Sequence, residues 1–226
     1  MEKVYKNTHV LGLFSGFPEH HFCDAIGKVL HEIIAKRDNI VFISADPENY
    51  EQNDDDRDGM HEMFAELGLA FNEKYVIDRR MDAQEATRLV RAADCIWLMG
   101  GESKWQMELI RDLGLVSELH KSNALILGVS AGSMNLGHYV AYVWDKPEFY
   151  EAIGLTDITI KSHYEEGEWF IPALLEMSKI HPIVAMEDHS AIFVKGNEIV
   201  RIGSMHLVDN GVIRPIDDEK ILRSFL

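Results

Sequence analysis

Ser130 has the surroundings expected of a nucleophile. It lies in Gly128-Val129-Ser130-Ala131-Gly132, directly after the apolar residues 124–127. This G-x-S-x-G pattern predicts a buried strand, a sharp turn at the serine and a helix that begins near Ala131. The hydroxyl would then stand at a helix N-terminus, where unpaired N–H groups favour a developing negative charge. The simpler alternative is a glycine-flanked turn that carries a solvent-exposed serine.

A serine hydroxyl needs a base to act as a nucleophile at neutral pH. Among the 11 histidines, His163 follows the short apolar stretch 158–161 and precedes a loop that contains Gly167. A strand end is a rigid place from which a base can face a crevice, so spacing favours His163. The alternatives that spacing leaves open are His181, His189 and His206.

A carboxylate should orient the imidazole of the base. The candidates after the serine are Asp145, Asp157, Glu187 and Asp188, and the last two directly follow the apolar stretch 183–186. An oxyanion would need two backbone donors, which we expect from Ala131 and from either Gly101 or Glu102. Gly100 would let a substrate approach the backbone closely.

The N-terminal half alternates apolar strands with amphipathic helices. The sequence predicts strands at 10–14, 39–44, 75–77, 95–99 and 124–128, and Asp82 and Ser103 have the setting of helix caps. Such alternation predicts a parallel sheet with helices on both faces and a functional crevice at the carboxyl ends of the strands. Both Gly100-Gly101 and Ser130 lie at such ends. The acidic stretch 46–58 is interpreted as a solvated loop leading into a helix rather than a metal site.

After residue 138 the pattern changes to short strands. Two hairpins are predicted, one joining 191–194 to 198–200 and the other joining 206–208 to 212–213. The expected fold class is therefore α/β, a three-layer αβα arrangement with a mainly parallel sheet and C-terminal antiparallel hairpins. We expect residues 1–226 to form a single domain.

The composition narrows the classes of partner. A net charge of −16 argues against nucleic acid or an anionic membrane as a partner, and no apolar run reaches the length of a membrane span. The two cysteines suit buried free thiols in the cytoplasm. No ligand cluster, G-x-G-x-x-G or P-loop is visible, so no metal or other cofactor is expected.

Taken together, these motifs resemble the peptidase E (aspartyl dipeptidase) and cyanophycinase group of serine peptidases, which share a class I glutamine amidotransferase-like fold. The resemblance rests on Gly100-Gly101, the Ser-Ala-Gly turn, Trp144-Asp145-Lys146-Pro147, the Ser162-His163-Tyr164 segment after Gly154-Leu155, and Met186-Glu187-Asp188. It implies Ser130 as nucleophile, His163 as base and Glu187 as the orienting acid, with Asp188 and Asp145 as secondary acids and Gly101 and Ala131 as oxyanion donors. The implied substrate is a small peptide, contacted by Gly100, Glu102, Lys161 and Tyr164. The sequence leaves open whether the protein forms a homodimer.

The sequence departs from the aspartyl dipeptidase at the loop after His163. Basic residues are expected there for a substrate carboxylate, but the loop reads Glu165-Glu166-Gly167-Glu168-Trp169. An acidic rim would disfavour an aspartyl side chain and favour a free amino or cationic group. Two other functions remain open: an α/β-hydrolase esterase, whose base would come late in the chain, and a non-catalytic binding homologue. Glutamine amidotransfer is disfavoured because that chemistry uses cysteine at the turn.

Overall fold

The computed structural model describes residues 9–225, and its main feature is a seven-stranded sheet with the order β11-β10-β1-β5-β4-β2-β3. The five strands from β1 to β3 in that order run parallel, while β10 and β11 add an antiparallel hairpin at the β1 edge. The strands of this sheet are β1 (Val10–Phe14), β2 (Asn39–Ala45), β3 (Glu73–Ile77), β4 (Cys95–Gly101), β5 (Leu125–Val129), β10 (Ala191–Lys195) and β11 (Glu198–Ile202). The expected mainly parallel sheet and its first C-terminal hairpin are confirmed.

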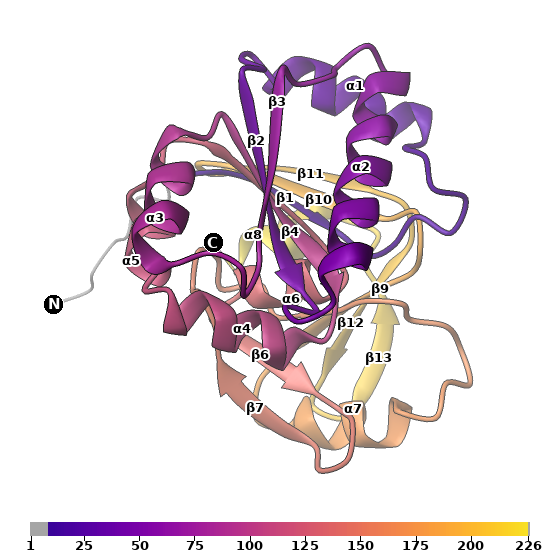
Figure 1. Ribbon diagram of the computed structural model, residues 1–226. Coiled ribbons are helices and arrows are strands. Elements are labelled where there is room, and N and C mark those ends of the chain that lie inside the picture. The colour runs from indigo at the N-terminus through magenta and orange to yellow at the C-terminus, as the bar shows by residue number, and fades with distance from the viewer. Residues whose placement is uncertain (1–8, 226) are drawn as a thin grey trace, which may run out of the picture.

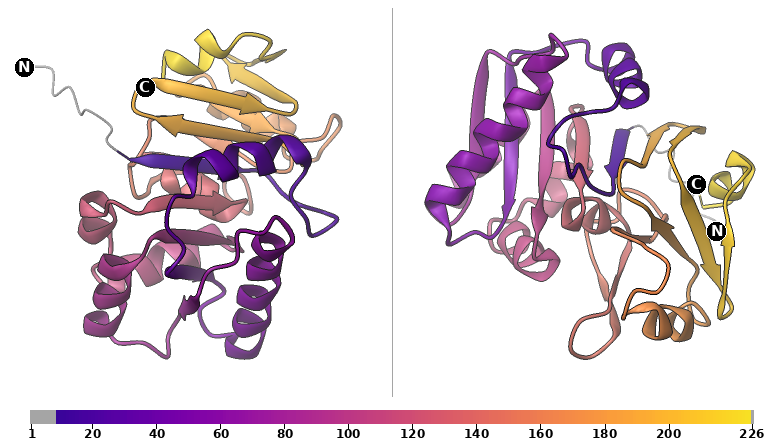
Figure 2. Two further views of the ribbon diagram at one scale, coloured as in Figure 1. Left: turned by 90° about the horizontal axis from the view of Figure 1, so that it is seen from above. Right: turned by 90° about the vertical axis from the view of Figure 1, so that its right-hand side faces the viewer.

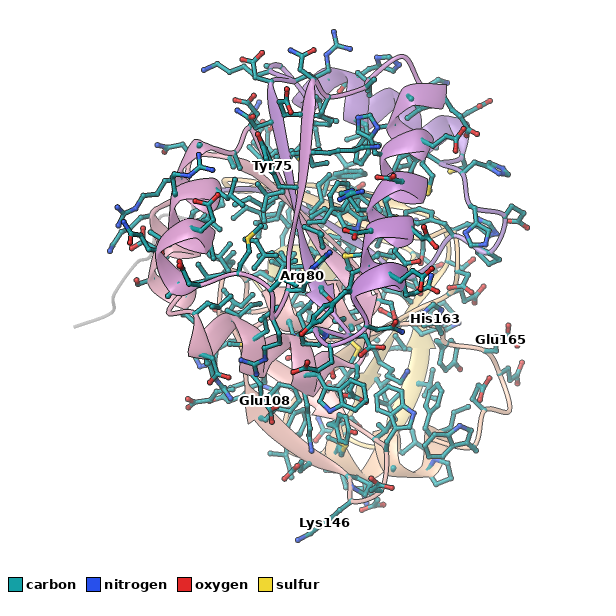
Figure 3. The ribbon with its side chains drawn as sticks, in the orientation of Figure 1. Tyr75, Arg80, Glu108, Lys146, His163 and Glu165 are labelled. Atoms are coloured by element: carbon teal, nitrogen blue, oxygen red, sulfur yellow. The ribbon has the colours of Figure 1, made fainter. Side chains whose placement is uncertain are left out.

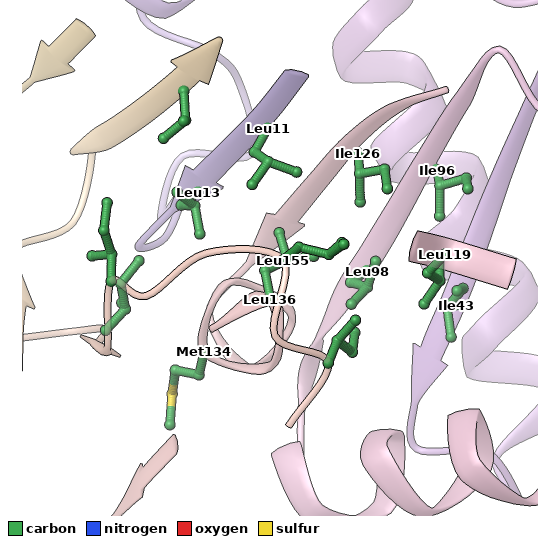
Figure 4. Packing of buried hydrophobic residues seen from close by; sticks show 14 of the residues in the cluster. Leu11, Leu13, Ile43, Ile96, Leu98, Leu119, Ile126, Met134, Leu136 and Leu155 are labelled. Atoms are coloured by element: carbon green, nitrogen blue, oxygen red, sulfur yellow. The ribbon is translucent and has the colours of Figure 1, made fainter. Parts of the chain in front are cut away.

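Helices cover both faces of this sheet (Figure 1). One face carries α1 (Asp24–Ile33) and α2 (Tyr50–Glu66), and the other carries the remaining helices of the N-terminal half. These are α3 (Ala83–Ala92), α4 (Ser103–Asp112), α5 (Val116–Lys121) and α6 (Ala131–Leu136). The alternation of side chains along a strand explains the two cores, because Trp97 packs toward α1 and α2 while Ile96 and Leu98 pack toward the opposite helices. Figure 4 shows Ile96, Leu98 and Ile126 in the core that also holds Met134 and Leu136.

The C-terminal part forms a second, four-stranded sheet with the order β13-β12-β9-β8. Its strands are β8 (Ile160–Lys161), β9 (Ile183–Met186), β12 (Met205–Asp209) and β13 (Val212–Pro215), and β12 and β13 form the second expected hairpin. The right-hand view of Figure 2 shows these orange-to-yellow strands on the opposite side of the molecule from α2. The remaining elements are the hairpin of β6 (Tyr139–Tyr142) and β7 (Glu148–Glu151), α7 (Ile171–Met177) and α8 (Glu219–Arg223).

The acidic stretch differs from the expectation, since residues 50–58 belong to α2 rather than to a loop. Basic partners neutralise its carboxylates: Arg57 and Arg80 both contact Asp54, and Arg80 also binds the fully buried Asp78. Arg57 pairs with Asp54 within the helix, whereas Arg80 reaches it from the segment after β3, a contact that a local pattern does not contain. Among residues 9–225, no helix is long and apolar enough to cross a bilayer.

Candidate active site

The turn at Ser130 has the expected shape of a nucleophile elbow. Ser130 joins β5 to α6 with φ 52° and ψ −113°, a region that non-glycine residues rarely occupy. Its backbone N–H donates to the Phe14 carbonyl at the end of β1. The strained backbone is therefore held by the neighbouring strand, and the side chain projects from the carboxyl edge of the sheet.

The glycines on either side of Ser130 are required by close packing. A Cβ atom on Gly128 would lie 2.6 Å from the Gly132 backbone, and one on Gly132 would lie 2.2 Å from the Leu98 carbonyl oxygen. Real Cβ atoms do not approach backbone atoms so closely. The G-x-S-x-G spacing is thus a consequence of how tightly α6 packs against β4 and β5.

His163 connects Ser130 to a carboxylate. Its Nε2 lies 2.8 Å from Ser130 Oγ, and its Nδ1 lies 2.7 Å from Asp188 Oδ1. A carboxylate partner at Nδ1 places the proton there and leaves Nε2 to accept the serine proton. The imidazole side chain is 50% exposed and the Asp188 side chain 30% exposed, so the three groups form a partly open site at the sheet edge (Figure 3).

The structure pairs His163 with Asp188 and not with Glu187 or Asp145. Glu187 is the neighbouring residue, but its carboxylate lies 3.8 Å from Nδ1 of His206. Asp145 lies in the turn between β6 and β7, next to Lys146, which Figure 3 shows at the hairpin tip away from His163. Because both ring nitrogens of His163 already have partners, the expectation that Glu187 orients the imidazole is corrected in favour of Asp188.

The other candidate histidines lie in different surroundings. His189 pairs with Glu19 at 2.9 Å, His206 packs 4.8 Å from the Tyr164 ring, and His181 packs against Tyr139. The imidazole that reaches Ser130 is that of His163. An esterase arrangement with a base late in the chain is therefore not what the structure shows.

The glycine segment at the end of β4 lies beside Ser130. A Cβ atom on Gly100 would lie 3.5 Å from the Cβ of Ser130, and Gly101 has φ 136°. The Glu102 N–H donates to the Ala45 carbonyl, which leaves Gly101 as the better of the two expected donors from this segment. Ala131 is the first residue of α6, so its N–H has no acceptor within the helix.

Glu102 has a structural role that differs from the prediction. It caps α4 by accepting from the Lys104 N–H at 3.1 Å, whereas Ser103 was expected to be the cap. The Ser103 hydroxyl is buried within the described part of the chain without a hydrogen-bond partner. Since the Glu102 carboxylate is turned toward its own helix, it is held away from the position where an oxyanion would develop.

Two predicted substrate-binding side chains are buried. Lys161 is 2% exposed and Tyr164 is 5% exposed, and Tyr164 packs in the cluster that contains Phe170 and Leu174. Lys161 Nζ donates to the Ser162 carbonyl at 2.7 Å and lies 4.1 Å from the centre of the Phe170 ring. Both residues support the segment that carries His163.

The sequence did not indicate Ser15 and Gly16, which follow β1 and lie against the His163–Asp188 pair. Ser15 Oγ accepts from the His163 N–H at 2.8 Å and lies 3.4 Å from Asp188 Oδ1. A Cβ atom on Gly16 would lie 2.4 Å from Asp188 Oδ1 and 2.6 Å from His163 Cε1. Their position at the carboxyl end of a strand next to β5 is the one signal that could have pointed to them.

We expect Gly16→Ala to lower kcat/KM by about 100-fold, because the added methyl group would displace the imidazole from Ser130. Gly59→Ala in α2 is the matched control, since a Cβ there meets nothing within 4 Å. The control should keep wild-type kinetics and gain about 0.5–1 kcal/mol of stability. Wild-type kinetics for Gly16→Ala would show that this packing does not constrain the site.

Burial lowers the pKa of the Lys161 ammonium to about 8, partly opposed by the charge of Glu168. The folded state therefore holds fewer protons than the unfolded state between about pH 8 and the usual lysine pKa of about 10.4, and stability rises with pH across this window. We expect Lys161→Met to raise the free energy of unfolding at pH 7 by about 1 kcal/mol, after allowing for the lost cation–π contacts and the lost hydrogen bond to the Ser162 carbonyl. Urea unfolding from pH 7 to 10.5 should show this advantage shrinking as pH rises. A destabilised variant at pH 7 would contradict the expected cost of the buried charge.

The described residues 9–225 contain no group of three or more His, Cys, Asp or Glu side chains placed to hold a metal ion. The chemistry available at the site is nucleophilic attack by an activated hydroxyl with nearby backbone donors. The two free cysteines, Cys23 and Cys95, lie in the α1 side of the core and not among these groups.

Comparisons with known proteins agree with this chemistry. Residues 12–202 match the profile of Peptidase family S51, and none of the curated protein sequences matches the chain significantly. A peptidase from an acI-B1 Actinobacterium has a similar fold, with TM-score 0.70 and 16% identity over 92% of this chain and 94% of that one. A putative peptidase E protein from Listeria monocytogenes EGD-e has TM-score 0.66 and 19% identity over 86% of this chain and 98% of that one.

The resemblance drawn from the motifs is therefore confirmed at the level of family and fold. The family profile covers most of the chain and includes Ser130, His163 and Asp188. The chain belongs to peptidase family S51, and it is a serine-type peptidase.

Proposed function

We propose that the protein hydrolyses small peptides through an acyl-enzyme on Ser130, with His163 as base and Asp188 as the orienting acid. The observation that carries this proposal is the continuous hydrogen-bonded series from Ser130 Oγ through the imidazole to Asp188 Oδ1. The strained backbone of Ser130 supports it, because such strain is retained where the surroundings hold a residue in a functional position.

In the first half of the reaction, Ser130 Oγ attacks the scissile carbonyl carbon while His163 Nε2 accepts the hydroxyl proton. The N–H groups of Ala131 and Gly101 would stabilise the oxyanion of the tetrahedral intermediate. When the C–N bond breaks, the imidazolium returns its proton to the leaving amine. Water then attacks the acyl-enzyme with His163 again as base, and Asp188 remains ionised throughout.

The substrate side chain is proposed to be small or to lie over an aromatic surface. Trp105, at the start of α4, and Trp144, after β6, are exposed large apolar side chains. Trp105 follows the Gly100-Gly101 segment beside Ser130, and the centre of the Trp144 ring lies 5.0 Å from Lys161 Nζ. Figure 3 shows Glu165 on a loop that extends away from His163. Gly100 is the remaining expected substrate contact that is exposed and lies beside Ser130.

The proposal is tested by labelling the folded protein with a fluorophosphonate, followed by peptide mapping and a panel of dipeptides with free and blocked N-termini. We expect the label on Ser130 and hydrolysis of peptides that have a free N-terminus. Labelling together with cleavage of blocked peptides would exclude the exopeptidase preference. If folded protein neither reacts with the probe nor hydrolyses any peptide, the proposed function is wrong and a binding homologue becomes the better description.

We also propose that the protein acts in the cytoplasm without nucleic-acid or membrane partners. The free thiols of Cys23 and Cys95 and the net charge of −16 support this. Fractionation of the native cell with an antibody against the chain would test it, and recovery in the membrane fraction would contradict it.

A further inference from the structure

The peptide unit between Ser162 and His163 is held at both of its polar ends by side chains. Its carbonyl oxygen accepts from Lys161 Nζ at 2.7 Å, and its N–H donates to Ser15 Oγ at 2.8 Å. These two side chains come from different sheets, since Ser15 follows β1 and Lys161 ends β8. A single peptide plane is thus fixed between the large sheet and the C-terminal sheet.

His163 needs this support because its backbone has φ 56°, in the left-handed region. A non-glycine residue there carries a cost of about 1–3 kcal/mol and persists only when its surroundings determine it. If the preceding peptide plane could rotate, the backbone could relax toward an ordinary conformation. The imidazole would then leave the line between Ser130 and Asp188.

We propose that Ser15 and Lys161 are positioning residues that clamp the Ser162–His163 peptide unit and thereby hold the imidazole in its working orientation. This inference rests on the proposed function, in which His163 is the base. Neither residue would touch the substrate or exchange a proton with it. Their effect would appear in kcat rather than in KM, because a misplaced base weakens the transition state and leaves peptide binding unchanged.

Ser15 is suited to this role because it is fully buried and its hydroxyl contacts both the backbone of His163 and the carboxylate of Asp188. Its hydroxyl has one proton, which it donates to the Met186 carbonyl at 2.9 Å, while its lone pair accepts from the His163 N–H. The Asp188 carboxylate lies 3.4 Å from the same oxygen. Ser15 therefore fixes the end of β9 and the start of the His163 turn relative to β1.

Lys161 is suited to it because its burial has a net cost. Burial lowers the pKa of its ammonium, the charge of Glu168 opposes this only in part, and the cation–π contacts are with the rings of Phe170 and Trp144 at 4.1 and 5.0 Å. Burying an unpaired charge is costly, and a methionine of similar length would fill the same space without that cost. A methionine would lose the cation–π contacts and the hydrogen bond to the Ser162 carbonyl, and of these only the hydrogen bond reaches the peptide unit before His163.

The test compares Ser15→Ala and Lys161→Met with wild type on whichever peptide the wild type hydrolyses. We expect each variant to lower kcat by about 10- to 100-fold, with KM within about threefold of wild type. Ser44→Ala is the matched control, because Ser44 is also fully buried and hydrogen-bonded at a strand end, to Asn53 at 2.7 Å. The control should lose stability but keep its kcat.

Lys161→Met separates positioning from general structural support. If Lys161 only stabilised the fold, its replacement would not lower kcat and raise stability together. We expect Lys161→Met to do both. The double variant should lose less than the product of the two single effects, because both side chains hold the same peptide unit. Wild-type kcat in folded Lys161→Met and Ser15→Ala, or an equal loss in Ser44→Ala, would overturn the proposal.

A second measurement keeps the test independent of peptide hydrolysis. The Nδ1 proton of His163, hydrogen-bonded to Asp188, should give a far-downfield proton resonance in the wild type that disappears in His163→Ala. We expect this resonance to broaden or vanish in Ser15→Ala and Lys161→Met, and to persist in Ser44→Ala. If the wild type hydrolyses nothing but the resonance behaves in this way, the proposed function fails while the clamp stands. An unchanged resonance in both variants overturns the clamp.

Discussion

Replacing Ser130 with alanine is expected to lower kcat by about 10⁴- to 10⁶-fold, because the attacking oxygen is removed while the fold is kept. The remaining acceleration over water, about 10³- to 10⁴-fold in comparable sites, would come from the backbone donors and from substrate binding. The measurement is hydrolysis of the best peptide from the panel, followed under single-turnover conditions so that slow residual turnover is seen.

The control for Ser130→Ala is structural. Alanine at this turn keeps the same backbone strain as serine, so the thermal midpoint should stay close to that of the wild type. The variant should also bind peptides with an affinity similar to the wild-type KM. Activity within tenfold of wild type would mean that another group is the nucleophile, and the acyl-enzyme mechanism would have to be abandoned.

Replacing Asp188 with asparagine is expected to lower kcat by about 10³- to 10⁴-fold, with a small change in KM. Asparagine has almost the same shape, but its amide can stabilise the wrong tautomer of His163 and cannot stabilise the imidazolium that forms during attack. Steady-state kinetics on the same peptide would measure the loss. The effect should be smaller than that of removing the base, because Asp188 acts on the reaction only through the imidazole that it orients.

Glu187→Gln is the matched comparison for Asp188→Asn. Glu187 precedes Asp188 in the chain and has the same charge, but its side chain lies near His206. We expect kcat within about threefold of wild type for this variant. The opposite result, with a severe loss in Glu187→Gln and a mild one in Asp188→Asn, would restore the acid that the family resemblance implied.

Together with the expected increase in stability of Lys161→Met, these results would show that the active site is maintained at the expense of folding stability. Ser130 and His163 both have positive φ, and Lys161 is a buried cation whose pKa is lowered by that burial. Each feature is unfavourable by itself, and each lies at the point where the two sheets meet. Such concentration of strain and buried charge is typical of functional sites.

The sequence by itself determined the features that depend on local geometry. The G-x-S-x-G spacing fixed the turn at Ser130, because only glycine fits at positions 128 and 132 where α6 approaches the strands. Alternation of apolar residues fixed the strands and the two cores, and the end of an apolar stretch pointed to His163. The predictions of the turn and the strands succeeded because each one depends on residues within about one strand or one helical turn of one another.

The tertiary structure alone decided which groups meet at the site. Glu187 and Asp188 follow the same strand, and consecutive residues there point in different directions. Only the placement of the end of β9 beside Ser15, which follows β1, selects Asp188. Ser15 lies 148 residues from His163 and 173 from Asp188, and no local pattern links them. Asp54 and Asp58 of α2 likewise found their partners Arg80 and Lys74 through the fold. The orientation of a base and the choice of its acid depend on how separate sheets pack, which is a property of the whole chain.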